Sequence, residues 1–371
     1  MRVLICGGGV VGASTAYFLS RQGVHATVIE RTGLACAASG KSGGFLALDW
    51  CDGTPLEPLA RRSFALHEQL TAEIGGEWGY RRMTTYGGSV DERRRLHRPS
   101  TRPIEWLSDA VTLDRRLGGI DTTAQVHPGA FTDALMRAAE VRGATLLRGR
   151  VTGMALDRGG SRILGVEVDG RVVPADAVVV AMGPWSVLAT AWLPLPRVFG
   201  LKGHSLVFDT GAAVPAEAVF LEYEGGDGMA HAPEVFPRSD GTTYVCGISS
   251  ESPLPIDPGA VAPDPGAIER LQAICGALSP ALASAPILAS QACYRPVVRD
   301  GLPLIGAVPG VAGAYVATGH SVWGILNAPA TGEAMAELIL NGEARVIDLS
   351  PFDPARLSLA NAGRSGRRPR D

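Results

Sequence analysis

Apolar and polar positions follow two different periods along this chain, and the changes of period mark the elements that we expect. The wholly apolar run Val3–Cys6 predicts a short buried strand. The segment from Gly12 to Gly23 predicts a helix that ends at a C-terminal glycine, and Ala26–Glu30 predicts a second strand. A strand, a helix and a strand in this order form the unit that produces a parallel sheet.

A longer helix is expected from residue 54 onward. Thr54-Pro55-Leu56-Glu57 matches a capping box with proline at the first helical position. Apolar residues recur behind it at helical intervals: Leu56, Leu59, Leu66, Leu70 and Ile74. Residues 83–127 are polar and show no regular period, so we expect an irregular segment there, with the basic run Arg93–Arg95 in a solvated loop.

The remaining chain predicts further strands and helices. We expect helices at Phe131–Arg142, Ile268–Leu278 and Pro329–Leu340, the last closed by Asn341-Gly342. Strands are expected at Val178–Met182, Ser205–Phe208, Thr243–Cys246, Gln291–Arg295 and Ala314–Thr318, and a hairpin over residues 164–174 turns at Asp169-Gly170. Pro253–Pro265 is expected to be a connection, and Gly363–Asp371 a disordered end.

Strand–helix units at both ends of the chain enclose a middle that is rich in strands. The fold class we expect is α/β, with one dinucleotide domain of Rossmann type built from residues 1–80, 128–195 and 290–345. A substrate domain with a mixed or antiparallel β-sheet, from residues 81–127 and 196–289, is expected as an insertion. Residues 346–371 are expected to form a C-terminal tail.

Composition narrows the class of protein. Hydrophobic residues make up 46% and charged residues 19%, which fits a globular core, and the net charge of -3 argues against nucleic acid as the main partner. The 6 cysteines show no C-x-x-C and no metal-ligand spacing, so we expect reduced thiols and no metal site. No run of about 18 apolar residues exists, and the apolar start is too short for a signal sequence. We therefore expect a cytoplasmic protein without a membrane span.

A glycine motif follows the first predicted strand. Gly7-Gly8-Gly9-Val10-Val11-Gly12 matches G-x-G-x-x-G, in which the first glycine permits a tight turn, the second admits a pyrophosphate and the third lets the helix pack on the strand. The helix N-terminus offers free N–H groups to the phosphates. Glu30 ends the second strand and can accept hydrogen bonds from a ribose, so an unphosphorylated ribose is favoured. The motif alone leaves FAD and NAD open.

Four segments of the chain resemble the D-amino-acid oxidase superfamily, whose members include glycine oxidase and sarcosine oxidase. They are the first 45 residues and the segments Val178–Ser186, Arg295–Gly306 and Thr318–Gly332, in the same order along the chain. Ala38–Ala47 and Gly319–Ile325 are most similar to a little-defined group of FAD-dependent oxidoreductases that also occurs in eukaryotes and fixes no substrate. The resemblance implies FAD as the cofactor and a glycine oxidase-like fold.

Two small-residue loops are expected at the flavin. Ser39–Gly44 can lie flat against a cofactor, and Gly319–Ile325 precedes a helix whose positive end would stabilise a reduced flavin that is anionic around N1 and C2=O. A plain strand-to-helix loop is the alternative for the second. With the motif and the resemblance, the expected FAD contacts are Gly7, Gly9, Val10, Val11, Gly12, Glu30, Arg31, Ser39, Gly40, Lys41, Gly43, Gly44, Phe45, Val151, Gly183, Trp185, Gly319, His320, Ser321, Val322, Trp323, Gly324 and Ile325.

Cys293 and Arg295 are two residues apart in a predicted strand, so they face the same side. In glycine oxidase-like enzymes the arginine of the matching motif grips the substrate carboxylate, which suits its planar fork; a surface salt bridge is the alternative for Arg295. Cys293 stands where sarcosine oxidase-like enzymes bond covalently to flavin. For Cys293 we favour the interpretation that it is a small buried hydrophobic residue.

Glu234 stands near the position where glycine oxidase places a substrate-binding tyrosine, which is a departure from that pattern. A carboxylate there would suit a substrate with an extra cationic group and would repel a plain diacid; a solvated loop glutamate is the alternative. The histidines His204, His231 and His320 are expected to be structural. Among them His320 is the best candidate for a catalytic group, because its loop should lie at the flavin.

The resemblance implies oxidation of a C–N bond beside a carboxylate, in an amino acid or an N-substituted glycine. Flavin N5 would accept hydride from the α-carbon, the imine would hydrolyse, and oxygen or another acceptor would reoxidise the flavin, with oxygen giving hydrogen peroxide. Only one G-x-G-x-x-G is present, so no second nicotinamide site is expected. Oxidation of a 2-hydroxy acid and a non-catalytic flavoprotein with an interaction role stay open, and so does the oligomeric state.

Overall fold

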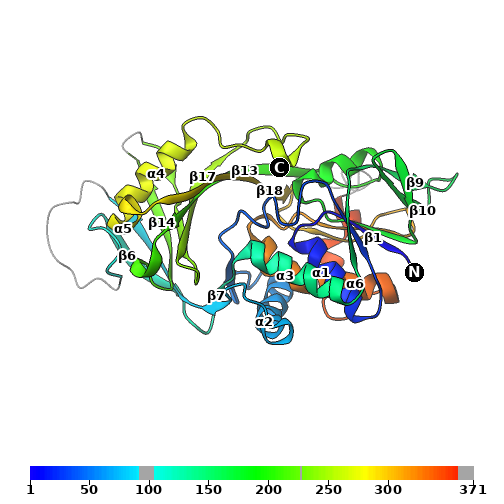
Figure 1. The fold of residues 1–371 in the computed structure, drawn as a ribbon, viewed down its shortest axis with the longest axis horizontal. Coiled ribbons are helices and arrows are strands. Elements are labelled where there is room, and N and C mark those ends of the chain that lie inside the picture. The colour runs from blue at the N-terminus through cyan, green and yellow to red at the C-terminus, as the bar shows by residue number, and fades with distance from the viewer. Residues whose placement is uncertain (92–103, 226–227, 358–371) are drawn as a thin grey trace, which may run out of the picture.

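The fold is seen in a computed structural model that describes residues 1–91, 104–225 and 228–357, and a six-stranded sheet lies at one end of it (Figure 1). Its strand order is β19-β20-β12-β1-β2-β8, and all neighbours are parallel except β19 and β20. The strands are β1 (Val3–Cys6), β2 (Thr27–Glu30), β8 (Thr145–Arg148), β12 (Ala177–Val180), β19 (Leu304–Ala307) and β20 (Ala314–Thr318). Strands β1 and β20 have the predicted bounds. The predicted parallel sheet is confirmed.

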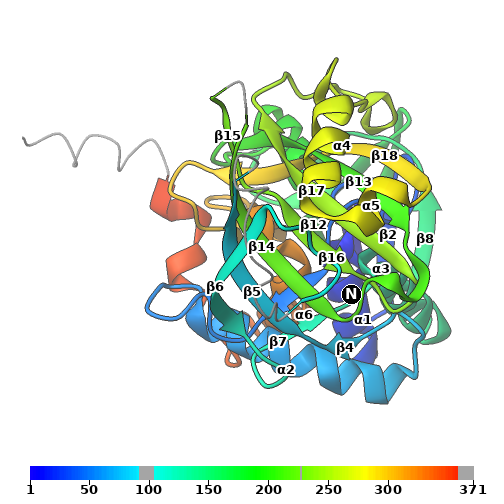
Figure 2. The same cartoon turned by 90° about the vertical axis from the view of Figure 1, so that its left-hand side faces the viewer.

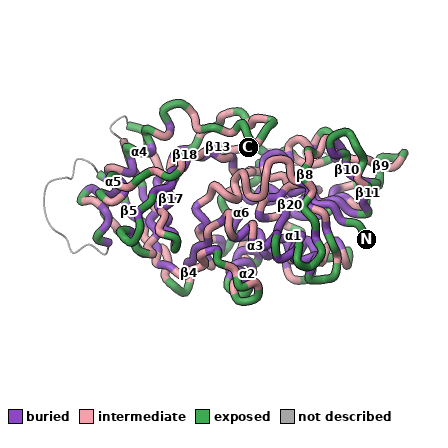
Figure 3. The backbone as a smooth tube through the Cα atoms, viewed as in Figure 1, coloured by how far each residue is buried: buried purple, intermediate pink, exposed green. Residues whose placement is uncertain are grey.

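Both faces of this sheet are covered, which explains why its strands read as continuous apolar runs. Successive side chains point to opposite faces, so Ile5 packs with the helices on one side and Cys6 with a small sheet on the other. The helices are α1 (Val10–Arg21), α2 (Glu57–Ile74), α3 (Pro128–Val141) and α6 (Gly324–Asn341). The small sheet consists of β9 (Val151–Leu156), β10 (Ile163–Val168) and β11 (Arg171–Pro174). The buried positions cluster around these layers in Figure 3.

The β10–β11 hairpin turns as the sequence predicts. Asp169 and Gly170 both have positive φ, 48° and 79°. Two consecutive residues with positive φ match the twist of the flanking strands. The predicted hairpin is therefore confirmed.

A larger sheet forms the other half of the molecule (Figure 2). Its order is β18-β13-β17-β16-β14-β5-β6, with β15 paired to β14, and the parallel pair β14–β5 makes it mixed. The strands are β5 (Thr84–Val90), β6 (Val111–Gly118), β13 (Val198–Asp209), β14 (Glu217–Glu224), β15 (Ala230–His231), β16 (Glu234–Pro237), β17 (Thr242–Ser250) and β18 (Ile287–Val298). Helices α4 (Ala267–Leu278) and α5 (Pro280–Ser284) contribute to the core on one face of it.

The expectation of an irregular segment over residues 83–127 is wrong. This stretch supplies β5 and β6 to the large sheet, and β7 (Thr123–Gln125) to a small sheet with β3 (Phe45–Ala47) and β4 (Arg81–Arg82). Strand β5 fills most of its buried positions with Thr85, Gly87 and Gly88, Val90 being its one buried large apolar residue, and β6 is an exposed edge strand. Neither therefore shows an apolar period. The run Arg93–Arg95 lies outside the described residues, as does Gly363–Asp371.

Several predicted helix starts are corrected, and α3 begins at Pro128 instead of Phe131. Helix α2 begins at Glu57, and Leu56 is its N-cap, so Thr54 is not the cap and Pro58 instead of Pro55 stands in the first turn. The Glu57 carboxylate accepts from the Gly53 amide at 2.8 Å, which ties the preceding turn to the helix. Helix α1 begins at Val10, two residues before the expected Gly12.

Helix α6 begins at Gly324 and not at Pro329, because the proline is tolerated inside it. Proline has no N–H to donate to the carbonyl four residues earlier. His67 of α2 reaches that carbonyl: its Nε2 lies 3.0 Å from the oxygen of Ile325 and 3.2 Å from that of Leu326. Ser63 Oγ accepts from the Ala330 amide at 3.0 Å. Helix α2 therefore supports the first turns of α6, and this pairing has no signature in the sequence.

The segments expected to form the substrate domain, 81–127 and 196–289, supply most of the large sheet. Strand β18 crosses the expected boundary: it begins at Ile287 and continues to Val298 in the segment 290–345 assigned to the dinucleotide domain. The described part of the expected tail packs on the core, with Ile347 and Phe352 buried. Within the described ranges, none of the helices has the length and apolar character that a membrane crossing needs.

Candidate active site

A deep pocket of about 480 Å³ lies where the six-stranded sheet meets the large sheet, and residues of both halves line it. Of the expected cofactor contacts, all but Gly12, Gly40 and Gly319 line this pocket, and so do Arg295, Glu234 and His320. Segments from residue 7 to residue 325 therefore converge on one cavity. The three exceptions are glycines that pack behind the residues that line the pocket.

The glycine turn between β1 and α1 is closely packed. Gly7 has φ of 114°, and a Cβ there would lie 2.4 Å from the Ala181 carbonyl oxygen. A Cβ at Gly12 would lie 2.1 Å from the Gly7 oxygen, so Gly12 packs the helix onto the turn instead of facing the pocket. Gly9 is the N-cap and offers no capping side chain, while the Val10 amide donates to Ser39 Oγ at 2.9 Å. The N-terminus of α1 thus opens onto the cavity, as an anion site requires.

Glu30 both lines the pocket and organises it. One carboxylate oxygen accepts from the Gly8 amide at 2.8 Å, and the other accepts from the amides of Thr32 and Gly33 at 2.7 and 3.2 Å. A carboxylate offers about four acceptor positions, so these three donors leave capacity for a ribose hydroxyl. The sequence predicted the ribose contact but not the support that Glu30 gives to the glycine turn.

The small-residue loop from Ser39 to Gly44 lies flat along the cavity because its glycines touch neighbouring groups. A Cβ at Gly43 would lie 2.2 Å from the Phe236 ring, and one at Gly40 would lie 2.2 Å from the Ala35 oxygen. Ser42 Oγ is buried at the pocket and has no hydrogen-bond partner among the described residues. An orphaned hydroxyl beside an open glycine cradle indicates a polar group that completes the site.

The second loop, from Gly319 to Ile325, enters α6 beside the pocket. Gly319 has φ of 84°, and a Cβ there would lie 2.5 Å from a Val298 methyl group. Ser321 also has a positive φ, 51°. The N-cap residue Trp323 supplies no side-chain cap, and residues 320–325 line the pocket, so the positive end of α6 faces the cavity.

His320 is buried in this loop, and its Nε2 lies 3.0 Å from Thr331 Oγ1. Burial lowers its pKa to about 4, so the ring is neutral near pH 7. It is thereby held by α6 at the edge of the cavity. His204 accepts from the Asp264 amide at 3.0 Å, which holds the connection after β17 against β13.

A strap formed by residues 253–258 crosses the pocket near Glu30. Trp185 Nε1 donates to the Pro255 oxygen at 2.7 Å, Arg31 donates to the Ile256 oxygen at 3.1 Å, and Arg31 pairs with Asp257 at 3.3 Å. Ile256 lines the pocket while 64% of it is exposed. The sequence indicated a proline-rich connection here, and its place over the cavity was missed.

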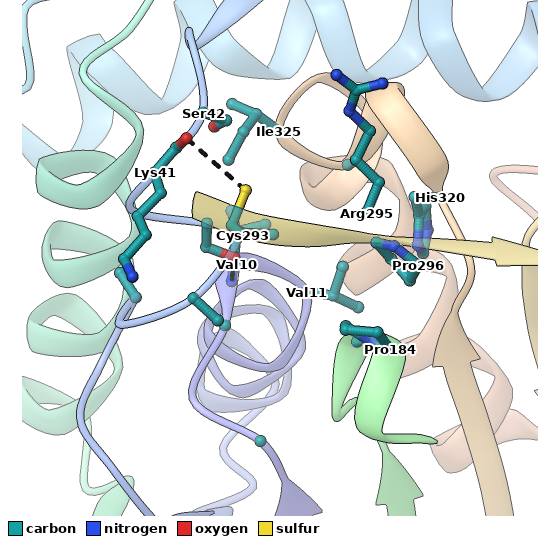
Figure 4. Close-up of a pocket in the computed structure, with 18 of the residues that line it drawn as sticks. Val10, Val11, Lys41, Ser42, Pro184, Cys293, Arg295, Pro296, His320 and Ile325 are labelled. Carbon is teal, nitrogen blue, oxygen red and sulfur yellow. Dashed lines mark hydrogen bonds between the residues drawn. The ribbon is translucent and has the colours of Figure 1, made fainter. Parts of the chain in front are cut away.

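The Arg295 guanidinium has no hydrogen bond or ion pair with any residue that the structure describes. Arg295 and Cys293 project from the same side of β18, as the strand period predicts (Figure 4). The guanidinium rests on Gly203 of the neighbouring strand, where a Cβ would lie 3.3 Å from Nη2. Five N–H donors of a fixed fork thus remain free for a ligand in the pocket.

Glu234 faces the same cavity from β16. Its carboxylate accepts from the Cys246 thiol at 3.5 Å. Burial raises the pKa of Glu234, and the positive charge of Arg295 acts in the opposite direction. The solvated loop glutamate is therefore not what the structure shows: Glu234 is a strand residue that lines the pocket.

Cys293 is held as a thiol. Its Sγ donates to the Lys41 carbonyl oxygen at 3.9 Å, drawn as a dashed line in Figure 4. Burial raises its pKa. The hydroxyl of Tyr244 donates to the same oxygen at 3.1 Å. In the described ranges, no cluster of His, Cys, Asp or Glu could hold a metal ion.

These features fit FAD: glycine turns that side chains would close, two helix N-termini whose N-cap residues supply no capping side chain, an acid for a ribose and an orphaned hydroxyl. Such an arrangement belongs to a dinucleotide-binding oxidoreductase. The profile described as FAD dependent oxidoreductase (DAO) matches residues 2–338, and this chain belongs to that family. The cofactor of the family is FAD, and the protein is an FAD-dependent oxidoreductase.

Individual relatives agree in fold and extent. A Schizosaccharomyces pombe protein whose name goes no further than oxidoreductase is 31% identical over 380 residues, which cover 95% of this chain and 97% of that protein. Glycine oxidase of Geobacillus kaustophilus is 28% identical, with 95% of this chain and 96% of that protein covered. The crystal structure of glycine oxidase from Geobacillus kaustophilus matches with a TM-score of 0.78 at 26% identity and covers 96% of this chain and 99% of that chain.

Proposed function

We propose that this protein oxidises the C–N bond of an amino acid or N-substituted glycine whose carboxylate is bound by Arg295. The observation that carries the proposal is the unpaired guanidinium of Arg295 in the pocket of an FAD-dependent family member. A partly buried arginine without a protein partner is costly unless a ligand supplies the acceptor. A carboxylate matches its fork with two parallel hydrogen bonds.

The oxidation removes the α-hydrogen with two electrons, and one proton from the nitrogen of a neutral amine, so a substrate that binds as a zwitterion first loses the extra proton of its ammonium group. Water then hydrolyses the imine to a 2-oxo acid and ammonia, or an amine where the nitrogen is substituted. Bound FAD would supply the acceptor for the two electrons, which oxygen, with formation of hydrogen peroxide, or another acceptor would then take up. The chain contributes position and charge. Arg295 fixes the carboxylate, and Glu234 offers a negative charge to a positively charged group of the substrate.

The choice of an amine is supported by the relatives named glycine oxidase and by Glu234. A negative carboxylate in the pocket favours a substrate that carries positive charge, which an amino acid does and a 2-hydroxy acid does not. Because Glu234 and Arg295 both line the cavity, a zwitterion matches the two charges together. The small-molecule substrate and the electron acceptor are part of this proposal.

Anaerobic reduction of the bound flavin tests the proposal directly. The holoenzyme is mixed without oxygen with glycine, sarcosine, N-alkylglycines, D-amino acids, iminodiacetate and 2-hydroxy acids, and the absorbance of the flavin is followed. We expect bleaching by one or more of the monocarboxylic amines. Bleaching by 2-hydroxy acids alone would show that the substrate is a hydroxy acid and not an amine. No bleaching by any compound would favour a non-catalytic flavoprotein.

A further inference from the structure

A continuous wall of aromatic rings forms part of the pocket. It consists of Phe45, Trp50, Phe220, Phe236 and Tyr244, all of which line the cavity. The ring centroids of Phe45 lie 5.0 Å from Trp50, 5.1 Å from Phe220 and 5.4 Å from Phe236, and Phe220 lies 4.9 Å from Trp50. We call this set the aromatic wall. Phe45 is also one of the expected FAD contacts, whereas the catalytic proposal above gives no role to the other four rings.

The large sheet holds the aromatic wall beside the charged groups. Phe220 on β14 pairs in register with Glu234 on β16, and Phe236 pairs with Tyr244 on β17. Residues paired in register point to the same face of a sheet, so the rings and the Glu234 carboxylate share one surface. Gly43 fixes the far side, because any side chain there would collide with the Phe236 ring.

The polar atoms of the aromatic wall are already occupied. Trp50 Nε1 donates to the Leu117 oxygen at 3.3 Å, and the Tyr244 hydroxyl donates to the Lys41 oxygen at 3.1 Å. The surface presented to the cavity is therefore apolar. A substrate as small as glycine or sarcosine has no apolar group large enough to cover it, and water against such rings is unfavourable.

We infer that the natural substrate carries, besides its carboxylate and amine, a ring-sized apolar group that packs on the aromatic wall. The group is attached to the nitrogen or to the α-carbon. The inference rests on the proposed function, because the carboxylate at Arg295 and the positive charge at Glu234 orient the molecule so that its remaining substituent meets the rings. It predicts a preference for large aromatic amines over glycine.

Binding of carboxylates that cannot be oxidised tests the aromatic wall separately from the carboxylate site at Arg295. Acetate and phenylacetate share the carboxylate and differ by one phenyl ring, and a ligand beside the flavin perturbs its absorption spectrum. Titration of the holoenzyme with each gives two dissociation constants without any turnover. Burial of a phenyl ring against aromatic side chains should make phenylacetate bind at least about tenfold more tightly than acetate.

Two variants test whether the aromatic wall causes the preference for phenylacetate over acetate. Phe220→Ala removes a half-buried ring of the aromatic wall, and Phe199→Ala removes a ring that is 51% exposed on β13 and does not line the pocket. We expect Phe220→Ala to reduce the preference for phenylacetate to about threefold or less while acetate binding stays within about twofold of wild type. Phe199→Ala should keep the full preference, and the FAD content of each variant reports on its folding.

The outcomes are distinct. Equal binding of acetate and phenylacetate by the wild type, or a preference that Phe220→Ala leaves intact, overturns the inference and leaves the carboxylate site standing. Failure of both carboxylates to perturb the flavin contradicts the proposed function itself. If Phe220→Ala loses its FAD, Phe220→Leu provides the same comparison with an apolar side chain in place.

Discussion

Arg295 and Glu234 face one cavity with opposite charges, and no ion pair joins them. Arg295 comes from β18 and Glu234 from β16, with β13 and β17 between them in the sheet. Two opposite charges held apart in a pocket can each bind a complementary group of one ligand. A zwitterion such as an amino acid has this pattern, and this separation determines most of what we expect of the enzyme.

Glu234 should discriminate against a second carboxylate in the substrate. Glu234→Gln keeps the shape of the side chain and removes its charge, so the repulsion of a diacid disappears. We expect the ratio of kcat/KM for iminodiacetate to that for sarcosine to rise by about tenfold or more. Glu222→Gln, on exposed β14 surface, is the matched control and should change nothing. An unchanged ratio in Glu234→Gln would remove Glu234 from substrate selection.

FAD should be bound without a covalent link to Cys293. The thiolate is the nucleophilic form of cysteine, and burial raises the pKa of this thiol. Its proton is also donated to the Lys41 oxygen. Precipitation of the holoenzyme with acid should therefore leave yellow FAD in the supernatant. A yellow pellet that keeps its flavin after washing contradicts this prediction.

The strap of residues 253–258 should slow the release of FAD. Ile256 is largely exposed but lines the pocket near Glu30, where it can cover the nucleotide end of the cofactor. Ile256→Ser should speed FAD dissociation by roughly fivefold to tenfold, since about 1 kcal/mol of apolar contact is lost. The recovery of flavin fluorescence after dilution measures the rate. Ile120→Ser, at an isoleucine that is 59% exposed away from the pocket, should leave the rate unchanged; equal rates in all three proteins contradict the prediction.

The stability of the fold should fall in mildly acid solution because of His67. Burial lowers its pKa to about 4 from 6.5, so the unfolded chain binds more protons between these pH values. His67 should contribute a drop of roughly 1.4 kcal/mol in the free energy of unfolding for each pH unit of acidification across this window. The equally buried His320, whose pKa is also lowered to about 4, adds its own drop, so the His67 share is read from the difference between wild type and variant. His67→Gln keeps a donor for the α6 carbonyls and cannot titrate, so its Tm should fall less between pH 6.5 and 4. The exposed His25→Gln is the control, and identical pH profiles in all three proteins would exclude His67 as the cause.

The sequence predicts the parts of the site that depend on local backbone geometry. The glycine turn, the acid after β2 and the shared face of Cys293 and Arg295 all follow from spacing and strand period. The aromatic wall does not, because its rings come from β3 and the turn after it and from β14, β16 and β17, which only the tertiary fold brings together. The strap over the pocket is likewise held by contacts between distant residues such as Trp185 and Pro255.

Within the fold, the elements missed are those whose burial does not come from large apolar residues. Strand β5 is buried mostly through Thr85 and two glycines, with Val90 as its one buried large apolar residue, and β6 has an exposed edge, so neither carries a period-2 apolar pattern. Helix α6 was expected to start at Pro329 because proline normally ends a helix. His67, which is far away in the sequence, supplies the missing hydrogen bond to α6 and so permits the proline.

The central claim, that Arg295 anchors the carboxylate of an oxidised amine, is tested most directly by comparing an acid substrate with its carboxamide. Charge-assisted hydrogen bonds of a partly buried arginine contribute roughly 1.5–3 kcal/mol, so Arg295→Ala should lose about 10- to 150-fold in kcat/KM for the acid while it keeps bound FAD. Arg295→Lys should recover little, because an ammonium cannot form the fork. Wild type should prefer the acid strongly and Arg295→Ala should not. An equal preference for the acid in both proteins would show that the carboxylate is held elsewhere, and no preference in either would show that the substrate has none.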